Sequence, residues 1–351
     1  MLYHHSRSEN RTVAAEFRIS AGRPMALLGA CPAYQPTPLR DAPELAAQLG
    51  LARLWIKDET ARMRLGSFKA LGGAFAVVQM ILDRADVADP ISQAARGTAK
   101  TMTFVTASAG NHGLSVASGA RIFGARAKIV LSASVPEAFA NRIRATGAEV
   151  IRITGSYEDS VQEAVRRATA HDWIHLADGS WEGYTAAPAL VMEGYTVLAE
   201  EARCSFLDSG GWPSHVLLQA GVGGLAAACA AHIRTFWDQQ PEIIVVEPAA
   251  APCLMESMRA GHLVRTPGPV SNMGRLDCKD ASLLAFQTLQ QDADTFVTVT
   301  DEQAQAAVGT LALAGVHSTP SGAAAIAAIP LLGLPPEARC MIIASEGPEG
   351  H

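Results

Sequence analysis

One lysine in the first quarter of the chain has the surroundings of a reactive amine. Lys69 lies in residues 66–73 (GSFKALGG), a small, apolar segment bounded by glycines. Burial without charged neighbours disfavours the ammonium form, so we expect the pKa of Lys69 to fall and its free amine to act as a nucleophile. Such an amine can form a Schiff base with a carbonyl compound. A solvated helix lysine is the plainer alternative, so the hypothesis requires a site for the carbonyl partner.

Two turns elsewhere in the sequence have the composition of anion-binding loops. Residues 106–113 (TASAGNHG) follow an apolar strand at 103–105 and precede a small-residue helix at 114–122. Residues 219–225 (QAGVGGL) follow a strand at 215–218 and precede an alanine-rich helix at 226–236. Backbone N–H groups at such turns face anions, and glycines let a phosphate approach closely. A helix N-cap at Asn111 and tight packing at the glycines are the structural alternatives.

The glycine-rich turn also fits a nicotinamide dinucleotide. Gly221, Gly223 and Ala226 match the dinucleotide fingerprint. Glu247 ends the next strand, where a carboxylate that binds ribose would lie. This alternative explains neither Lys69 nor the loop at 106–113. An NAD-dependent dehydrogenase is therefore the weaker hypothesis.

Pyridoxal 5′-phosphate requires a Schiff-base lysine, a polar turn for a carboxylate and a glycine loop for a phosphate, in one protein. In these features the sequence resembles the fold-type II pyridoxal-phosphate enzymes, and above all the diaminopropionate ammonia-lyases. Further landmarks of the ammonia-lyases follow in order: 34–39 (YQPTPL), 57–60 (KDET), 181–184 (WEGY), 246–248 (VEP) and 345–347 (SEG). The loop at 107–112 instead resembles that of the threonine dehydratases, because Ala109 stands where the ammonia-lyases usually have an aspartate.

The resemblance implies an α/β fold with two domains, each a largely parallel sheet flanked by helices. It places a large cofactor-binding domain at 1–73 and 186–351 and a small inserted domain at 74–185. Short Val/Ile/Leu runs that alternate with alanine-rich stretches also indicate βαβ units, and 351 residues suit two domains. We expect residues 95–100 to form a surface loop.

The resemblance also assigns roles to single residues. Lys69 becomes the Schiff-base lysine, and Asp178 becomes a second acid–base group, although an ordinary Asp-Gly turn is the plainer interpretation. The remaining candidates form two sets. The cofactor ligands are Phe68, Asn111, Gly221, Val222, Gly223, Gly224 and Ser345. The substrate ligands are Ser108, Ala109 and His112.

A serine at position 345 favours one type of reaction. By resemblance Ser345 reaches the pyridine nitrogen, where a hydroxyl cannot stabilise the protonated ring as a carboxylate would, so a long-lived carbanion is disfavoured. We therefore predict β-elimination from an L-2-amino acid to a 2-oxo acid and ammonia. The leaving group stays open between the hydroxyl of threonine, serine or an aryl-serine and the amine of 2,3-diaminopropionate. A β-replacement synthase with the same cofactor is the alternative.

Composition limits the partners and the cellular setting. The formal net charge is −6 without a basic cluster, which argues against nucleic acid. No apolar stretch is long enough to span a membrane, and the N-terminus lacks the core of a secretory signal, so we expect a cytoplasmic protein. The six cysteines lack metal-ligand spacing, so no metal site is expected. The resemblance implies a homodimer and a Cys253–Cys278 pair that can bridge, although a reducing cytoplasm favours free thiols.

Overall fold

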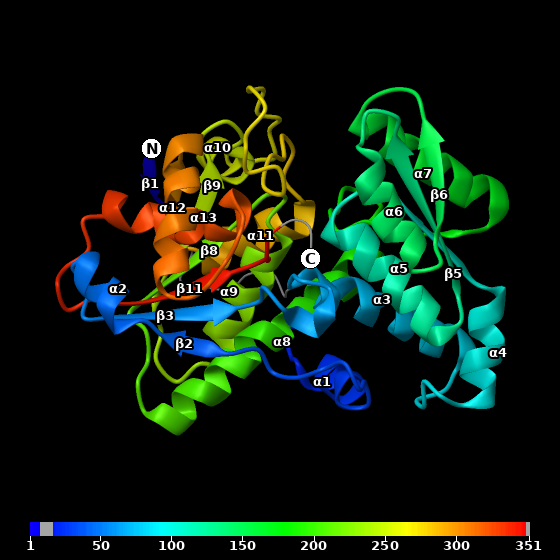
Figure 1. Cartoon of the computed structure of the whole chain (residues 1–351), viewed down its shortest axis with the longest axis horizontal. Helices are drawn as coiled ribbons and strands as arrows, with labels where there is room; N and C mark the ends of the chain where they lie inside the picture. The colour runs from blue at the N-terminus through cyan, green and yellow to red at the C-terminus, as the bar shows by residue number, and fades with distance from the viewer. Residues whose placement is uncertain (8–16, 349–351) are drawn as a thin grey trace.

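The computed structural model describes residues 1–7 and 17–348, which form two β-sheets with helices around them (Figure 1). The larger sheet has the strand order β1-β10-β9-β8-β11-β3-β2. Its five inner strands are parallel, whereas β1 and β2 pair antiparallel at the two edges. The strands are β1 (Leu2–His4), β2 (Leu39–Asp41), β3 (Arg53–Asp58), β8 (His215–Gln219), β9 (Glu242–Pro248), β10 (Thr295–Val299) and β11 (Arg339–Ala344).

The smaller sheet, drawn in cyan and green in Figure 1, is wholly parallel with the order β6-β5-β4-β7. It consists of β4 (Thr103–Thr106), β5 (Arg126–Ser132), β6 (Glu149–Ile153) and β7 (Ile174–His175). All four strands lie within residues 74–185. The division into domains at those residues stays a prediction.

Helices alternate with the strands, as the hydrophobic pattern predicted. Between the sheets and around them lie α1 (Gly22–Gly29), α2 (Pro43–Gln48), α3 (Lys69–Ala85), α4 (Gln93–Thr101), α5 (Asn111–Phe123), α6 (Glu137–Ala145), α7 (Tyr157–His171), α8 (Ala186–Ser209), α9 (Gly224–Phe236), α10 (Cys253–Ala260), α11 (Leu283–Asp292), α12 (Asp301–Leu313) and α13 (Pro320–Ala328), with short 3-10 helices η1 (Arg62–Arg64) and η2 (Ile329–Leu331). The strands expected near 103, 215 and 341 and the helices expected after 114 and 226 are confirmed.

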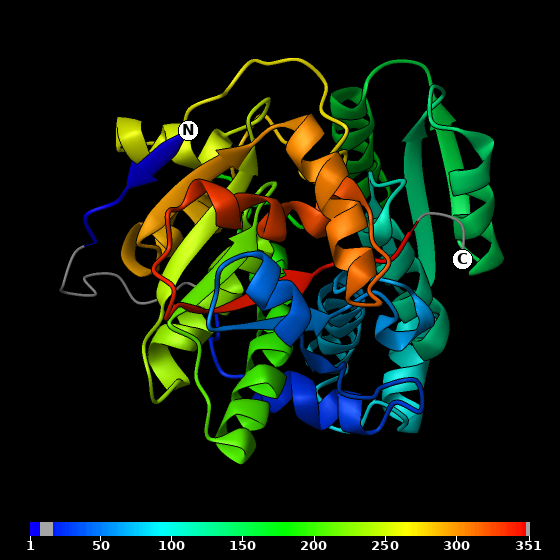
Figure 2. The ribbon, with the colours of Figure 1, turned by 60° about the vertical axis from the view of Figure 1, so that its left-hand side comes forward.

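The helix that begins at Lys69 packs unusually close to two others, α5 and α8. A Cβ atom on Gly72 would clash with the ring of Tyr195, and one on Gly73 would lie 2.6 Å from Oγ of Ser115. A Cβ atom on Gly194 would lie 2.5 Å from the carbonyl oxygen of Leu71. These three glycines therefore allow the close approach that fixes α3 between the two sheets, which Figure 2 shows as separate layers.

One local prediction is wrong. Residues 95–100 are not a loop but part of α4, whose N-terminus is capped by the Ser92 side chain, which accepts a hydrogen bond from Ala95 N at 3.2 Å. Ala95 and Ala99, four residues apart, are buried, so the helix has one apolar stripe that holds it in place. Within the described residues, no helix combines the length and the apolar character needed to cross a membrane.

Candidate active site

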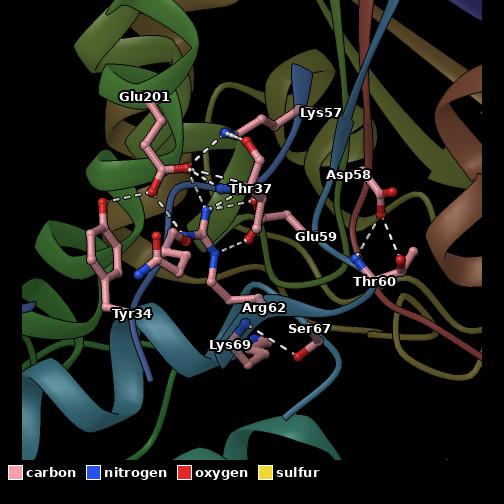
Figure 3. A network of polar contacts seen from close by, with 11 residues as sticks. Tyr34, Thr37, Lys57, Asp58, Glu59, Thr60, Arg62, Ser67, Lys69 and Glu201 are labelled. Atoms are coloured by element: carbon pink, nitrogen blue, oxygen red, sulfur yellow. Dashed lines mark hydrogen bonds and ion pairs between the residues drawn. The ribbon is translucent and has the colours of Figure 1, made fainter. Parts of the chain in front are cut away.

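Lys69 is the first residue of α3 and is held beside the end of β11. The preceding turn requires glycine at Gly66, whose φ is +80°. Phe68 N donates a hydrogen bond to the carbonyl oxygen of Ser345 at 3.1 Å, and Ser67 pairs with Glu346 as an isolated β-bridge. Figure 3 shows Lys69 and Ser67 at the start of the helix, where Lys69 N donates to Ser67 Oγ at 3.3 Å. The turn therefore fixes the lysine at the carboxyl edge of the larger sheet.

The amine of Lys69 forms an ion pair with Asp178, which follows β7 of the smaller sheet. Burial disfavours both charges, but their mutual attraction is stronger, so the pKa of Lys69 is raised and the pKa of Asp178 is lowered from their ordinary values. The expected fall in the pKa of Lys69 is therefore wrong for the chain in this state. The local sequence around Lys69 is apolar as described, but the decisive charge comes from a residue 109 positions away.

Tyr195 is a part of the site that the sequence analysis missed. Its ring centroid lies 5.6 Å from Lys69 Nζ and 4.9 Å from the ring of Phe68, which itself lies 5.2 Å from the same amine. The Tyr195 hydroxyl is buried and has no hydrogen-bond partner within the described part of the chain. Burial raises the pKa of Tyr195, and the nearby Lys69 charge only partly opposes this. Tyr195 lies in the middle of α8, where nothing local distinguishes it from a core aromatic.

The glycine-rich turn has the shape of an anion cradle. Gly223 has a φ of +99°, and a Cβ atom there would lie 2.8 Å from Cβ of Ala285. A Cβ atom on Gly221 would lie 3.0 Å from Sγ of Cys278. The backbone N–H groups of Gly221 and Gly223 donate no hydrogen bond to any described residue, and α9 begins directly after them. Unpaired N–H groups at a helix N-terminus are what a phosphate needs.

This cradle borders the Lys69–Asp178 pair. A Cβ atom on Gly224 would lie 3.7 Å from both the carbonyl oxygen of Asp178 and Cε2 of Tyr195. A Cβ atom on Gly179, the residue after Asp178, would lie 3.9 Å from Cγ1 of Val222. The structure thus brings the predicted lysine, aspartate and glycine loop together in one place.

The loop before α5 contributes the other predicted ligands. The Asn111 amide donates to the carboxylate of Glu346, which also accepts from Thr319 Oγ1 at 2.5 Å. Ser108 Oγ accepts from the N–H of Gly110 at 3.3 Å, inside the loop itself. His112 is buried with Nε2 2.9 Å from the carbonyl oxygen of Leu176, and burial lowers its pKa. Glu346, a further residue that the sequence analysis did not single out, therefore links this loop to the segment after β11.

Ser345 and Ala109 are the remaining predicted positions, and the structure shows what surrounds each of them. Ser345 is buried and connected to the lysine segment through the backbone bond from Phe68. Ala109 lines a small cavity together with Asn111, Arg142 and Arg275. Position 109 therefore shares this cavity with the predicted cofactor ligand Asn111 and with two guanidinium groups.

Glu247 is not available to bind a ribose. Its buried carboxylate accepts hydrogen bonds from the N–H groups of Leu254 and Met255, at 2.7 and 2.8 Å, and so caps α10. Burial raises the pKa of Glu247 to about 8. The cysteines at 253 and 278 are both free thiols. The described residues contain no cluster of three or more His, Cys, Asp or Glu arranged to hold a metal ion.

Comparison with known proteins identifies the family. A family model described as "Pyridoxal-phosphate dependent enzyme" matches residues 30–346. The chain belongs to this family. The diaminopropionate ammonia-lyase of Escherichia coli (strain K12) is 34% identical over 276 residues, which cover 77% of this chain and 69% of the relative. A probable D-serine dehydratase of Acidovorax ebreus (strain TPSY) is 29% identical over 287 residues, or 74% of this chain and 62% of the relative.

Solved structures of pyridoxal-phosphate enzymes have the same fold. The Escherichia coli diaminopropionate ammonia lyase in complex with an aminoacrylate-PLP azomethine reaction intermediate gives a TM-score of 0.82 at 29% identity, covering 98% of this chain and 95% of that one. The processed form of threonine deaminase isoform 2 from Solanum lycopersicum gives 0.77 at 22% identity, covering 97% and 95%, and supports the fold alone. The predicted fold class, the pyridoxal 5′-phosphate cofactor and the assignment to the lyases are confirmed.

The residues present fit this cofactor. Within the described residues, the N–H groups of Gly221 and Gly223 are unpaired, and neither position has free space for a side chain, so a phosphate can approach the backbone. An amine lies beside it, together with a buried hydroxyl on Tyr195 that has no partner in the described chain. Polar atoms left unpaired in a buried site indicate a group that completes them.

Proposed function

We propose that this protein is a β-eliminating ammonia-lyase that converts an L-2-amino acid with a leaving group at C3 into a 2-oxo acid and ammonia. The observation that carries the proposal is the ion pair between Lys69 and Asp178 at the edge of the glycine cradle. A lysine amine and a carboxylate in contact provide two groups that can exchange a proton at the reacting carbons. The relationship to ammonia-lyases and dehydratases supports the same reaction class.

The residues that would hold the cofactor follow from their positions. Lys69 would hold it through its amine, and Gly221 to Gly224 would hold its phosphate. Asn111 would donate to its 3′-oxygen, and Ser345 would hydrogen-bond the ring nitrogen. Phe68 and Val222 would flank the ring. When bound, pyridoxal 5′-phosphate supplies an electron sink for negative charge at Cα.

The protein's own groups then move the protons. We propose that Lys69 Nζ accepts the proton from Cα and that Asp178 acts as its partner, because the two side chains are in contact. The leaving group at C3 departs as water or ammonia and requires one proton, which this pair can return. For serine, water lost from C2 and C3 is regained when ammonia is released. For 2,3-diaminopropionate, one water is taken up and two ammonia molecules leave.

The loop at 108–112 is the proposed carboxylate site. Ser108 supplies a hydroxyl, and the N–H groups at the start of α5 face outward from the helix N-terminus. His112 would keep the loop in position through its hydrogen bond to the carbonyl oxygen of Leu176. A fixed carboxylate orients Cα–H towards the Lys69 amine. Ala109 carries no acid, which supports a preference for L-substrates.

A panel of amino acids tests the proposal. The holoenzyme is assayed for 2-oxo acid and ammonia with L- and D-forms of serine, threonine, phenylserine and 2,3-diaminopropionate. We expect equal amounts of 2-oxo acid and ammonia from the hydroxy amino acids, and twice as much ammonia from the diamine. Absence of 2-oxo acid from every substrate would contradict the proposal. Parallel assays with added sulfide or indole test the β-replacement alternative, which requires a product that contains the added nucleophile.

The oligomeric state and the location in the cell remain proposals as well. The family resemblance implies a homodimer, which light scattering of the holoenzyme measures directly.

A further inference from the structure

A second cavity, separate from the candidate active site, is lined by residues of α1, α3, α4 and α5, four helices whose positions Figure 1 shows. Its volume is about 510 Å³, within the usual size range of small-molecule sites. None of the residues predicted to hold cofactor or substrate lines it. A pyridoxal-phosphate lyase needs no such cavity for its reaction.

The floor of the cavity is apolar and reaches the core. Leu28, Phe75 and Val78 line it and are themselves buried, so the space extends below the surface. Met63 also lines it, in a left-handed conformation with a φ of +50°, which is strained for a residue with a side chain. Ile122 lies at the opening and is 59% exposed. An apolar ligand would remove this surface from water, at roughly 0.8 kcal/mol per methylene group.

The rim of the cavity is cationic. Arg96 and Lys100 lie four residues apart on α4, and Arg121 lies on α5. Within the described chain, neither Arg96 nor Lys100 has an ion pair or a side-chain hydrogen bond, and Arg121 donates only to the carbonyl oxygen of Ala145 at 3.3 Å. Among the described residues, no aspartate or glutamate lines the cavity. The charges at the opening are therefore not neutralised by the lining.

We propose that this cavity binds an amphipathic anion, with an aliphatic or aryl body on the apolar floor and its charged group at Arg96, Lys100 and Arg121. The apolar floor selects a body of several carbon atoms. The rim selects against neutral and cationic head groups, because three positive charges lie at one opening without an acid among them. A free amino acid carries an ammonium group next to its carboxylate, which a cationic rim disfavours, so it is not the expected ligand.

A cysteine that lines the cavity can report whether a ligand is bound there. Cys31 is a free, partly exposed thiol that lines the cavity, whereas Cys204 is a free, exposed thiol on α8 outside it. Decanoate serves as the probe, with decanol and decylamine as matched neutral and cationic compounds. The holoenzyme is treated with N-ethylmaleimide, and labelling of each cysteine is followed by peptide mass spectrometry below the micelle-forming concentration.

We expect decanoate to protect Cys31 alone. At about ten times its Kd, the labelling rate of Cys31 should fall roughly tenfold, because only unliganded protein reacts, while the rate at Cys204 stays unchanged. Decanol and decylamine should protect Cys31 much less at the same concentration. Protection by all three compounds to the same extent would overturn the anion proposal. Complete absence of protection would also overturn it.

Variants on the rim complete the test. Replacement of both rim cations on α4 (Arg96→Gln with Lys100→Gln) should weaken decanoate binding by roughly tenfold and leave decanol unaffected, since each exposed charge contributes modestly. Ile122→Glu should remove binding, because it places a negative charge at the opening. Arg166→Gln, an exposed cation on α7 outside the cavity, is the matched control and should bind decanoate as the wild type does. Equal affinities in all four proteins would refute the site.

Discussion

Two charged clusters, one around Arg62 and the other around Lys69, differ in how completely their hydrogen bonds are satisfied. The first, which we call the buried ion network, is formed by Lys57, Glu59, Arg62 and Glu201 (Figure 3). Every nitrogen of the Arg62 guanidinium donates to at least one oxygen, and Arg62 is 0% exposed. The second cluster is the Lys69–Asp178 pair, whose side chains are 20% and 24% exposed.

The difference separates a structural cluster from a chemical one. The buried ion network has equal numbers of positive and negative groups, and its remaining polar atoms are paired with Tyr34 and Thr37. Within the described residues, every nitrogen of Arg62 and Lys57 already donates to an oxygen. The Lys69–Asp178 pair is joined by one hydrogen bond. Beside it lie an anion cradle and the buried Tyr195 hydroxyl, which makes no well-aligned hydrogen bond within the described residues. Spare hydrogen-bonding capacity, rather than charge alone, marks the site.

Removal of the lysine should have the largest effect. We expect Lys69→Ala to lower kcat by about 10⁴-fold or more, because the variant loses both the amine that holds the cofactor and the proposed base. The thermal unfolding midpoint should stay near that of the wild type, since the side chain is partly exposed. Borohydride reduction and peptide mass spectrometry should attach the cofactor to Lys69 in the wild type and to no residue in the variant. Lys128→Ala, at a lysine of β5 that pairs with Glu149 outside both sites, should keep full activity, and full activity in Lys69→Ala would disprove the assignment.

Removal of the central arginine of the buried ion network should lower the stability of the protein rather than its activity. We expect Arg62→Met to lower the free energy of unfolding by about 3–5 kcal/mol, because two buried carboxylates lose their partner. Urea unfolding of the holoenzyme measures this, and kcat per folded molecule should change little. Arg166→Met, at an exposed ion pair, should unfold like the wild type. A variant of wild-type stability with lost turnover would make Arg62 part of the catalytic site.

The same network should make stability depend on acid. Burial disfavours the charged form of Glu201, but its bonds to Arg62 and Lys57 outweigh this, so the pKa of Glu201 is lowered from 4.5. A lowered pKa in the folded state means that the contribution to stability is present above pH 4.5 and is lost as the pH falls below it. Urea unfolding across this pH range measures the loss. In Arg62→Met, the free energy of unfolding should fall less steeply as the pH falls, because Glu201 then keeps only Lys57 as its partner.

The sequence predicted several residues of the candidate site but not the contacts between them. Lys69, the glycine loop and the alternation of strands and helices follow from local composition and spacing, so they could be read from the chain. Asp178 was proposed, yet its effect on the pKa of Lys69 could not be predicted, because the pair forms only when the smaller sheet packs beside α3. Glu201 joins Lys57 from 144 positions away, which no local pattern signals. Tyr195 was missed for the same reason, although Gly72 and Gly194 mark where α3 and α8 approach closely.

Substitution of the aspartate should have an intermediate effect. We expect Asp178→Asn to lower kcat by about 10²-fold, since the lysine stays but its proton partner is lost. In the cofactor-free protein, the pKa of Lys69 should fall, because burial remains while the opposing attraction of the carboxylate is removed. The pH dependence of acylation at Lys69, followed by mass spectrometry, measures this shift. An unchanged pH profile would mean that Asp178 does not control the lysine, whatever the activity.

Addition of an acid to the substrate loop should have the smallest effect and concerns stereochemistry. Wild-type protein should act on L-forms and little on D-forms, because Ala109 cannot accept a proton. Ala109→Asp should therefore produce measurable D-activity while L-activity is largely kept. The gain should stay below the roughly 10²-fold of a well-placed base, because position 109 shares a cavity with Arg142 and Arg275, which attract the new carboxylate away from the substrate. Ala109→Asn is the matched control, since it has similar size without a basic group. Rates on both enantiomers of serine and 2,3-diaminopropionate decide the matter: comparable wild-type rates on the two forms would show that this chain does not need an acid at 109 for the D-form.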